Sequence, residues 1–311
     1  MNDAVGIVIP VRDRASLIGR CLDSVWAQTW RPLHVVVVDN DSSDTTIDVV
    51  KEWGERHGAF DKDAALRLEI LSEKKPGACA ARNLGLRYVD TPYLLFFDSD
   101  DEMHPALVED AMDAIGDADL VYWRGTVVGL DGKKRSKPFY KGNLLARQIY
   151  NCLLSTQLYM ARPEVFRRVG GWDEAASAWN DWELGIRIAM SDVKAVALDK
   201  ELVTIHAQKK SITGTGFLPR RGEWENTLAI IERRVTESEL LPARKKRLYQ
   251  MLAYRRMILA VQYCKEGDRE AAEELLREAC SAPALGRARR ALLRLLYRYT
   301  LRGGRAAYLL W

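Results

Sequence analysis

The first hundred residues alternate short apolar runs, rich in β-branched residues, with segments whose apolar residues recur at helical spacing. This alternation constrains the fold more than any other feature, because it is typical of parallel strands joined by crossover helices. The apolar runs predict strands over 5–11, 33–38, 66–71 and 93–97. Helices are expected after a Ser16 cap, after the DSSDTT cluster that offers several caps, and over 78–89.

The middle of the chain is less regular. Residues 120–130 followed by DGKK predict a hairpin with its turn at Asp131 and Gly132. Further elements are expected as a helix near 143–154, a strand near 157–161, a helix from about Asn180 and strands near Val196 and Leu202. From about Phe217 the composition changes to Arg, Leu, Ala and Glu with helical periodicity. We therefore predict an α/β domain over 1–216, with a mostly parallel sheet and flanking helices, and an all-helical region over 217–311.

Charge and composition exclude several classes of protein. The 311 residues carry a net charge of only +4, which requires no nucleic-acid partner, and a 48% hydrophobic content excludes a disordered chain. The five cysteines are scattered without a C-x-x-C pair, so neither a disulfide framework nor a zinc cage is favoured. The N-terminus is expected to form a strand and not a signal peptide, and no apolar stretch is long enough to span a membrane. We expect a cytoplasmic protein.

Carboxylates follow two of the predicted strands. In an open α/β sheet, ligands bind beyond the carboxyl ends of the strands, which is where Asp39 and Asp98 are expected. The run FFDSDDEM adds Asp100 and Asp101, and oxygen ligands of this kind hold the hard cations that neutralise a diphosphate. A solvated acidic turn before a helix from Pro105 would explain the same run.

Five segments occur together in an order and spacing that resemble the inverting family-two glycosyltransferases. They are IVIPVRDR, VVVVDNDSSDTT, PGACAARNLGL, YLLFFDSDD and GGWDE followed by WNDWELGIR. The resemblance covers about residues 4 to 210. It implies a GT-A fold, a nucleotide-sugar donor and a divalent metal, Mn²⁺ or Mg²⁺.

The resemblance also implies which residues bind the donor. Asn40 stands where the family commonly has an aspartate, and because an amide both donates and accepts, the nucleotide base stays open. Residues 10–13 could also form an ordinary turn after the first strand without binding a ligand. Arg82 could likewise lie along the surface of its own helix. The residues implied to bind the donor are Pro10, Val11, Asp13, Asp39, Asn40, Arg82, Asp98 and Ser99.

Metal ligands are implied in the same way. Asp100, in the D-x-D pattern with Asp98, would bind the cation, with Asp101 as the alternative if the register differs by one. His206 would supply a third ligand or a phosphate contact, although a lone histidine can equally be structural. The segment 209–211, Lys-Lys-Ser, would lie over the diphosphate as a lid or form a solvated basic loop.

Asp181 matches the position of the family's catalytic base. It shares a helical stripe with Leu184, Gly185 and Ile188, so it is expected to face inward, with Asn180 as the helix cap. The spacing of Glu183 and Arg187 predicts a solvent-facing ion pair. The alternative for Asp181 is a carboxylate that only favours the helix dipole.

The implied reaction is a single displacement. Asp181 would deprotonate an acceptor hydroxyl, of a glycan or a lipid-linked saccharide as in polysaccharide biosynthesis, which attacks the anomeric carbon and inverts it. The alternative is an inactive nucleotide-sugar-binding subunit or scaffold. A nicotinamide dehydrogenase is disfavoured, because no G-x-G-x-x-G turn follows the first strand.

The C-terminal segment is strongly basic. Residues 240–280 predict two amphipathic helices separated by the KEGDRE turn, and from Arg287 onward seven arginines occur without an acidic residue. Such a helix either lies on anionic lipid, as a peripheral attachment to the inner face of a membrane, or docks on the protein with its arginines solvated.

Overall fold

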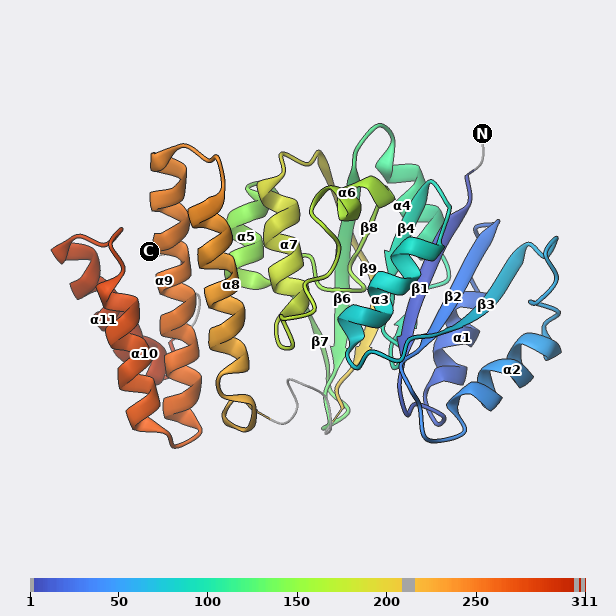
Figure 1. The fold of residues 1–311 in the computed structure, drawn as a ribbon, viewed down its shortest axis with the longest axis horizontal. Helices are drawn as coiled ribbons and strands as arrows, with labels where there is room; N and C mark the ends of the chain where they lie inside the picture. The colour runs from blue at the N-terminus through green and yellow to red at the C-terminus, as the bar shows by residue number, and fades with distance from the viewer. Residues whose placement is uncertain (1–2, 209–215, 305–307, 309–310) are drawn as a thin grey trace. The chain divides into compact units, whose positions relative to one another are not determined.

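The computed structural model describes residues 3–208, 216–304, 308 and 311 (Figure 1). The chain forms two compact units, which we describe separately. The sheet unit comprises Met1–Leu144, Cys152–Glu174 and Asn180–Gln208. The helical unit comprises Leu145–Asn151, Ala175–Trp179 and Lys209–Trp311. The domain boundary predicted at residue 216 stays a prediction.

Parallel strands form one half of the sheet. Strands β1 (Val5–Val11), β2 (Leu33–Asp39), β3 (Leu66–Ser72) and β4 (Tyr93–Phe96) lie in the order β3-β2-β1-β4. Their register places Val11 opposite Asp39, and Asp39 opposite Ser72. The carboxyl ends of β1, β2 and β3 are therefore level, which brings the loops that follow them to one edge of the sheet.

The other half of the sheet is mixed. Strand β8 (Tyr159–Ala161) is antiparallel to both β4 and β6 (Leu120–Val128), and β6 forms the predicted hairpin with β7 (Lys134–Ser136). The two strands expected near Val196 and Leu202 are one strand, β9 (Ala195–His206), which runs parallel to β6 and absorbs the interruption as register shifts. Strand β5 (Glu102–Met103) pairs with β9.

Helices cover both faces of this sheet (Figure 1). One face packs against α1 (Ile18–Trp26), α2 (Thr46–Arg56) and α4 (Leu107–Ile115). The opposite face packs against α3 (Ala78–Tyr88), α6 (Pro163–Arg168) and α7 (Asn180–Met190). Along β1, Ile7 and Ile9 belong to the first core and Val8 to the second, as the alternation of a strand buried on both faces requires.

The predicted helix caps have different outcomes. Helix α1 begins at Ile18 after Leu17, without a side-chain cap, so the cap predicted at Ser16 is wrong. In α2 the N-cap residue Thr45 makes no side-chain cap hydrogen bond, but the carboxylate of Asp44 just before it accepts the N–H of Thr46 at 2.9 Å.

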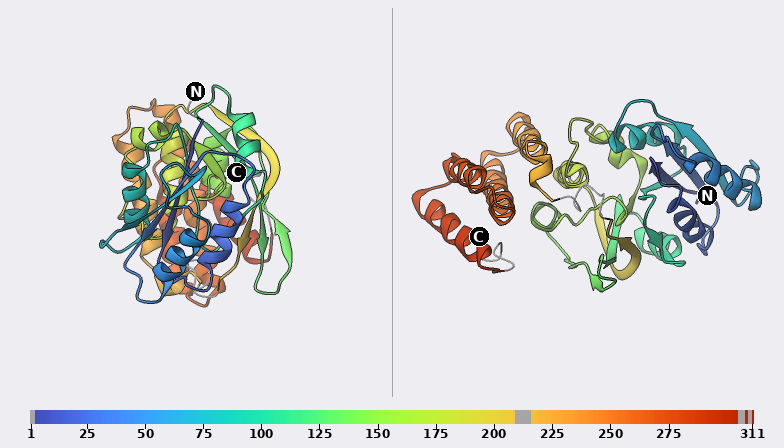
Figure 2. Two further views of the ribbon diagram at one scale, coloured as in Figure 1. Left: turned by 90° about the vertical axis from the view of Figure 1, so that its right-hand side faces the viewer. Right: turned by 90° about the horizontal axis from the view of Figure 1, so that it is seen from below.

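In its described residues, the helical unit contains α5 (Leu144–Asn151) from its second residue onward, a short 3₁₀ turn (Leu218–Arg220) and four longer helices. These are α8 (Glu223–Glu237), α9 (Pro242–Lys265), α10 (Arg269–Ser281) and α11 (Arg287–Leu301), orange to red in Figure 2. The predicted turn between α9 and α10 is confirmed, and Asp268 caps α10 by accepting the N–H of Ala271 at 2.9 Å. Helix α8 lies in the region expected to be helical from about Phe217, although no separate helix was placed there.

Helix α11 packs on the protein along one stripe. Leu293 and Leu296 are buried in a core shared with α9 and α10, whereas Leu295 is 59% exposed. Within the described residues, none of the helices combines the length and apolarity that crossing a bilayer needs. The docked interpretation of α11 agrees with this packing, and membrane attachment stays a prediction.

Candidate active site

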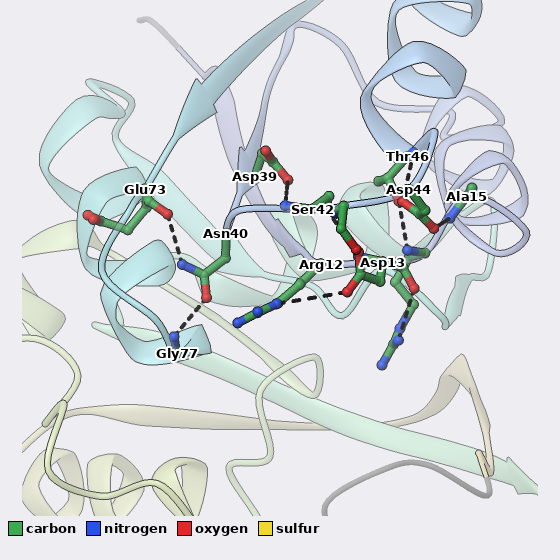
Figure 3. Close-up of polar contacts among 12 residues, drawn as sticks. Arg12, Asp13, Ala15, Asp39, Asn40, Ser42, Asp44, Thr46, Glu73 and Gly77 are labelled. Carbon is green, nitrogen blue, oxygen red and sulfur yellow. Dashed lines mark hydrogen bonds and ion pairs between the residues drawn. The ribbon is translucent and has the colours of Figure 1, made fainter.

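The loops after β1 and β2 are bonded to each other at the edge of the sheet (Figure 3). Asp13, whose φ is +51°, accepts the N–H of Ser43 at 2.7 Å and its hydroxyl at 3.1 Å. Its own N–H donates to the Ser42 hydroxyl at 3.1 Å. The hydrogen bond from the Ser43 N–H lowers the pKa of Asp13. The Asp13 carboxylate, which was predicted to bind the donor, therefore holds these two loops together.

Asn40 has a structural task that its sequence position did not reveal. It is 4% exposed, and its amide donates to the carbonyls of Glu73 at 3.0 Å and Lys75 at 2.7 Å. Its side-chain oxygen accepts the N–H of Gly77 at 2.7 Å, where the φ of +118° opens α3 (Figure 3). The Asn40 side chain therefore positions the 73–77 loop, and its role in donor binding stays a prediction.

The other residues predicted to bind the donor at this edge differ in which of their atoms a ligand can reach. The side chains of Pro10 and Val11 are buried, and the Val11 carbonyl accepts the N–H of Asn40 at 2.8 Å. Asp39 is half-buried, and one of its carboxylate oxygens accepts the N–H of Ser42 at 3.1 Å. Of the residues at this edge, Asp39 is the best placed to accept a hydrogen bond from a ribose or a base.

Arg82 is engaged by the protein on several sides. It is 5% exposed, and its guanidinium donates to Asp98 at 2.7 Å and to the side-chain oxygen of Asn180 at 3.5 Å. The same group lies 4.4 Å from the centroid of the Trp172 ring, an attractive cation–π contact. These partners hold the guanidinium, and Arg82 connects the end of β4 to the beginning of α7. Its direct contact with the nucleotide stays a prediction.

The members of the acidic run have different surroundings. Asp101 is 2% exposed, and its two oxygens accept from the Gln157 amide at 2.5 Å and from the His206 N–H at 2.9 Å. Burial is the main cause that raises the pKa of Asp101 to about 8. With both oxygens engaged, Asp101 is a poor alternative metal ligand. Ser99 is 6% exposed, which limits its contact with a ligand.

Asp100 is half-buried, as Asp98 is, but its carboxylate is less engaged by the protein. Within the part of the chain that the structure describes, its carboxylate accepts no hydrogen bond from another residue, although its carbonyl accepts from Arg20 at 2.7 Å. Burial, and then the charge of Asp98, raises the pKa of Asp100. A nearby cation would offset both effects.

His206 does not lie among free metal ligands. Its Nε2 is 2.6 Å from Glu102, which β5 places beside the end of β9. Among the described residues, no three acidic, histidine or cysteine side chains form a ready metal cage. Mg²⁺ and similar ions, however, bind through one or two carboxylates together with substrate phosphates and water. Asp100, with Asp98 beside it, fits a cation that arrives with a diphosphate.

Asp181 lies in the first turn of α7 and is half-buried. One carboxylate oxygen accepts from the Cys152 thiol at 3.5 Å, and the other accepts the N–H of Trp182 at 2.8 Å. The predicted inward stripe is confirmed for its other members, because Leu184, Gly185 and Ile188 are all buried. Sequence reasoning missed Cys152, since nothing local connects it to a residue 29 positions away.

Two features of α7 differ from what its sequence predicted. The helix begins at Asn180 itself, and the Asn180 side-chain oxygen faces Arg82, so the predicted cap is wrong. The ion pair of Glu183 and Arg187 is buried, at 0% and 7% exposure, with bonds of 2.7 and 2.5 Å. All residues of α7 from Trp182 to Ala189 are buried, so the face that was expected to meet solvent is packed as well. Residues 209–211, the predicted lid, lie outside the described residues.

The family model for Glycosyl transferase family 2 matches residues 6–168, and the chain belongs to this family. The uncharacterized glycosyltransferase YibD of Escherichia coli K12 is 26% identical over 119 residues, which cover 38% of this chain and 32% of YibD. The chain thus matches about a third of the length of this relative.

Solved structures share the fold. Staphylococcus aureus TarS 1–349 in complex with UDP-GlcNAc superposes with a TM-score of 0.72 at 20% identity, over 96% of this chain and 87% of that chain. The mannosyltransferase PcManGT of Pyrobaculum calidifontis, in complex with GDP-Man and Mn²⁺, gives a TM-score of 0.60 at 21% identity, over 96% and 83%. The predicted family and the GT-A fold with a helical C-terminal region are confirmed.

Proposed function

We propose that this chain is an inverting glycosyltransferase that moves a sugar from a nucleoside-diphosphate sugar to a hydroxyl of a glycan or a lipid-linked saccharide. The observation that carries the proposal is the position of Arg82. Its guanidinium contacts Asp98 at the end of β4 and Asn180, the residue before Asp181. The donor-side carboxylates and the base are thereby held around one buried side chain.

Asp181 acts as the general base. Its carboxylate takes the proton of the acceptor hydroxyl, whose oxygen attacks the anomeric carbon from the side opposite the leaving diphosphate. The bonds from Cys152 and Trp182 orient that carboxylate. General-base assistance of this kind contributes roughly 10²- to 10⁴-fold in rate.

Asp100 and Asp98 would hold a divalent cation at the diphosphate end of the donor. A bound Mn²⁺ or Mg²⁺ would supply charge compensation for the leaving diphosphate. Arg82 keeps Asp98 oriented, and Asp39 accepts from the ribose or the base. The carboxylate of Asp100, which takes no hydrogen bond from another described residue, supports its role as the principal ligand.

A melting-temperature screen tests the donor and the metal together. Nucleoside diphosphates and nucleotide sugars are added with and without Mn²⁺, because a ligand that binds only the folded state raises the apparent stability. We expect one nucleotide to raise the melting temperature, and the Mn²⁺-dependent part of that rise to disappear in Asp100→Asn. Asp117→Asn, which changes a carboxylate 88% exposed, is the matched control. An unchanged Mn²⁺-dependent rise in Asp100→Asn would contradict the metal role.

Turnover separates the enzyme from its alternative. Hydrolysis of the bound donor, or its transfer with inverted anomeric configuration, supports the proposal. A donor that is bound with Mn²⁺ but neither hydrolysed nor transferred to any saccharide would point to the inactive binding subunit. A cytoplasmic location, with attachment to the inner face of a membrane, remains part of the proposal where the acceptor is lipid-linked.

A further inference from the structure

The helical unit contains a cavity of about 470 Å³ that the proposed reaction does not use. Five of its lining residues come from the beginning of α9, at the i, i+3, i+4, i+7 and i+8 positions of one helix face. They are Ala243, Lys246, Arg247, Gln250 and Met251. The remaining wall comes from Tyr150 of α5, Arg289 of α11 and the chain end at Tyr308 and Trp311.

The charged side chains in this cavity have one sign. Lys246, Arg247 and Arg289 line it, and no acidic side chain lies among the described lining residues, although Arg289 also donates to the main-chain oxygen of Trp311 at 3.4 Å. Neither Lys246 nor Arg247 forms an ion pair within the described ranges, whereas Arg256 of the same helix pairs with Glu232 and Glu278, each at 2.8 Å. Three cations that share a cavity repel one another until an anion compensates them. An anion bound beside Lys246 and Arg247 would compensate this repulsion.

Aromatic rings also line the cavity. The rings of Tyr150 and Tyr308 stack with centroids 5.4 Å apart and an interplanar angle of 18°. The Trp311 indole N–H donates to the Gln250 carbonyl at 3.0 Å, and the Arg289 guanidinium lies 5.3 Å from the Trp311 ring centroid. These contacts hold the rings beside the cationic side chains. Fixed rings offer flat apolar surface to the C–H groups of a sugar or polyol.

We propose that this cavity is a second binding site, which takes a phosphate ester of a saccharide or polyol. The phosphate oxygens accept from Arg247, Arg289 and Lys246, and arginine holds phosphate with two parallel hydrogen bonds. The carbohydrate part lies against the tyrosine and tryptophan rings. A soluble phosphosaccharide and the headgroup of an anionic glycerolipid share this chemistry.

The test measures binding of glucose 6-phosphate, with glucose as the uncharged comparison, to the full chain and to Lys246→Glu/Arg247→Glu. Both side chains are exposed, so the substitutions should leave the fold intact, which an unchanged melting temperature verifies. We expect the double variant to bind glucose 6-phosphate about tenfold more weakly or worse. The matched control is Arg294→Glu/Arg298→Glu, which makes the same charge change at exposed positions of α11 outside the cavity.

Vesicles distinguish the two sources of the phosphate. Sedimentation with phosphatidylglycerol in phosphatidylcholine, against phosphatidylcholine alone, is compared for the same variants. Binding to vesicles but not to glucose 6-phosphate, if lost in Lys246→Glu/Arg247→Glu and kept in the control, assigns a lipid headgroup to the site. Equal loss in both double variants would show general charge attraction and overturn the proposal. Absence of binding to either probe would also overturn it.

Discussion

The guanidinium of Arg82 donates to the carboxylate of Asp98 at 2.7 Å, and the pair lies where β4 ends. Arg82 is almost fully buried, whereas about a third of the Asp98 side chain is exposed. The pair therefore fixes a carboxylate that still faces solvent. The hydrogen bond from Arg82 holds Asp98 in a fixed position, so the acidic run is more than a solvated turn.

Arg82→Met tests that relationship. The substitution removes the hydrogen bonds to Asp98 and Asn180, and we expect a loss of about 1–2 kcal/mol in the free energy of unfolding, because water can still reach Asp98. Denaturant unfolding measures the change. Arg167→Met breaks a pair whose members are 48% and 66% exposed and should change stability by less than about 0.5 kcal/mol. Equal losses of unfolding free energy in the two variants would contradict the conclusion that Arg82 holds Asp98 and Asn180 together.

Asn40→Asp should weaken the loop before α3. The carboxylate loses both amide donors and faces the carbonyls of Glu73 and Lys75 in a buried place, so we expect about 2–4 kcal/mol of destabilisation. Unfolding curves measure this, and the exposed Asp41→Asn is the control for a change at the neighbouring position. A variant as stable as the parent would show that Asn40 does not hold the 73–77 loop.

Glu183→Gln leaves Arg187 buried without its charged partner. Removing one member of a buried pair costs about 3–5 kcal/mol. Glu183→Gln/Arg187→Met should recover at least half of that loss, because the uncompensated charge is gone. Glu164→Gln, at an exposed position of α6, should be nearly neutral. If Glu183→Gln is as mild as Glu164→Gln, the pair faces solvent as the spacing alone suggested.

Cys152 should influence the rate and not donor affinity. Cys152→Ala removes the thiol that donates to Asp181, and we expect kcat to fall several-fold while KM for the donor changes little. Cys152→Ser keeps a donor and should restore most of the rate, which a purely structural role would not explain. Steady-state kinetics compares the two variants with the parent. If Cys152→Ala turns over as fast as the parent, Cys152 does not belong to the site.

The architecture could be predicted from local sequence patterns. The run over 33–38, for example, is continuously apolar, as in a strand buried on both faces, and it ends at a carboxylate. The contacts within the site were harder to predict from the sequence than the architecture. A sequence places Asn40 at a strand end but does not say that the 73–77 loop returns to it. The i,i+4 spacing of Glu183 and Arg187 is the same in a solvated and in a buried pair. Long-range packing decides both cases.

The central claim is that Asp181 is the base while Asp98, Asp100 and Asp39 bind the donor. The most direct measurement compares Asp181→Asn with the parent for donor binding, by the rise in melting temperature with Mn²⁺, and for sugar transfer, by released nucleoside diphosphate. We predict an unchanged rise and a rate lower by roughly 10²-fold or more. Transfer at the parental rate by Asp181→Asn would contradict the claim.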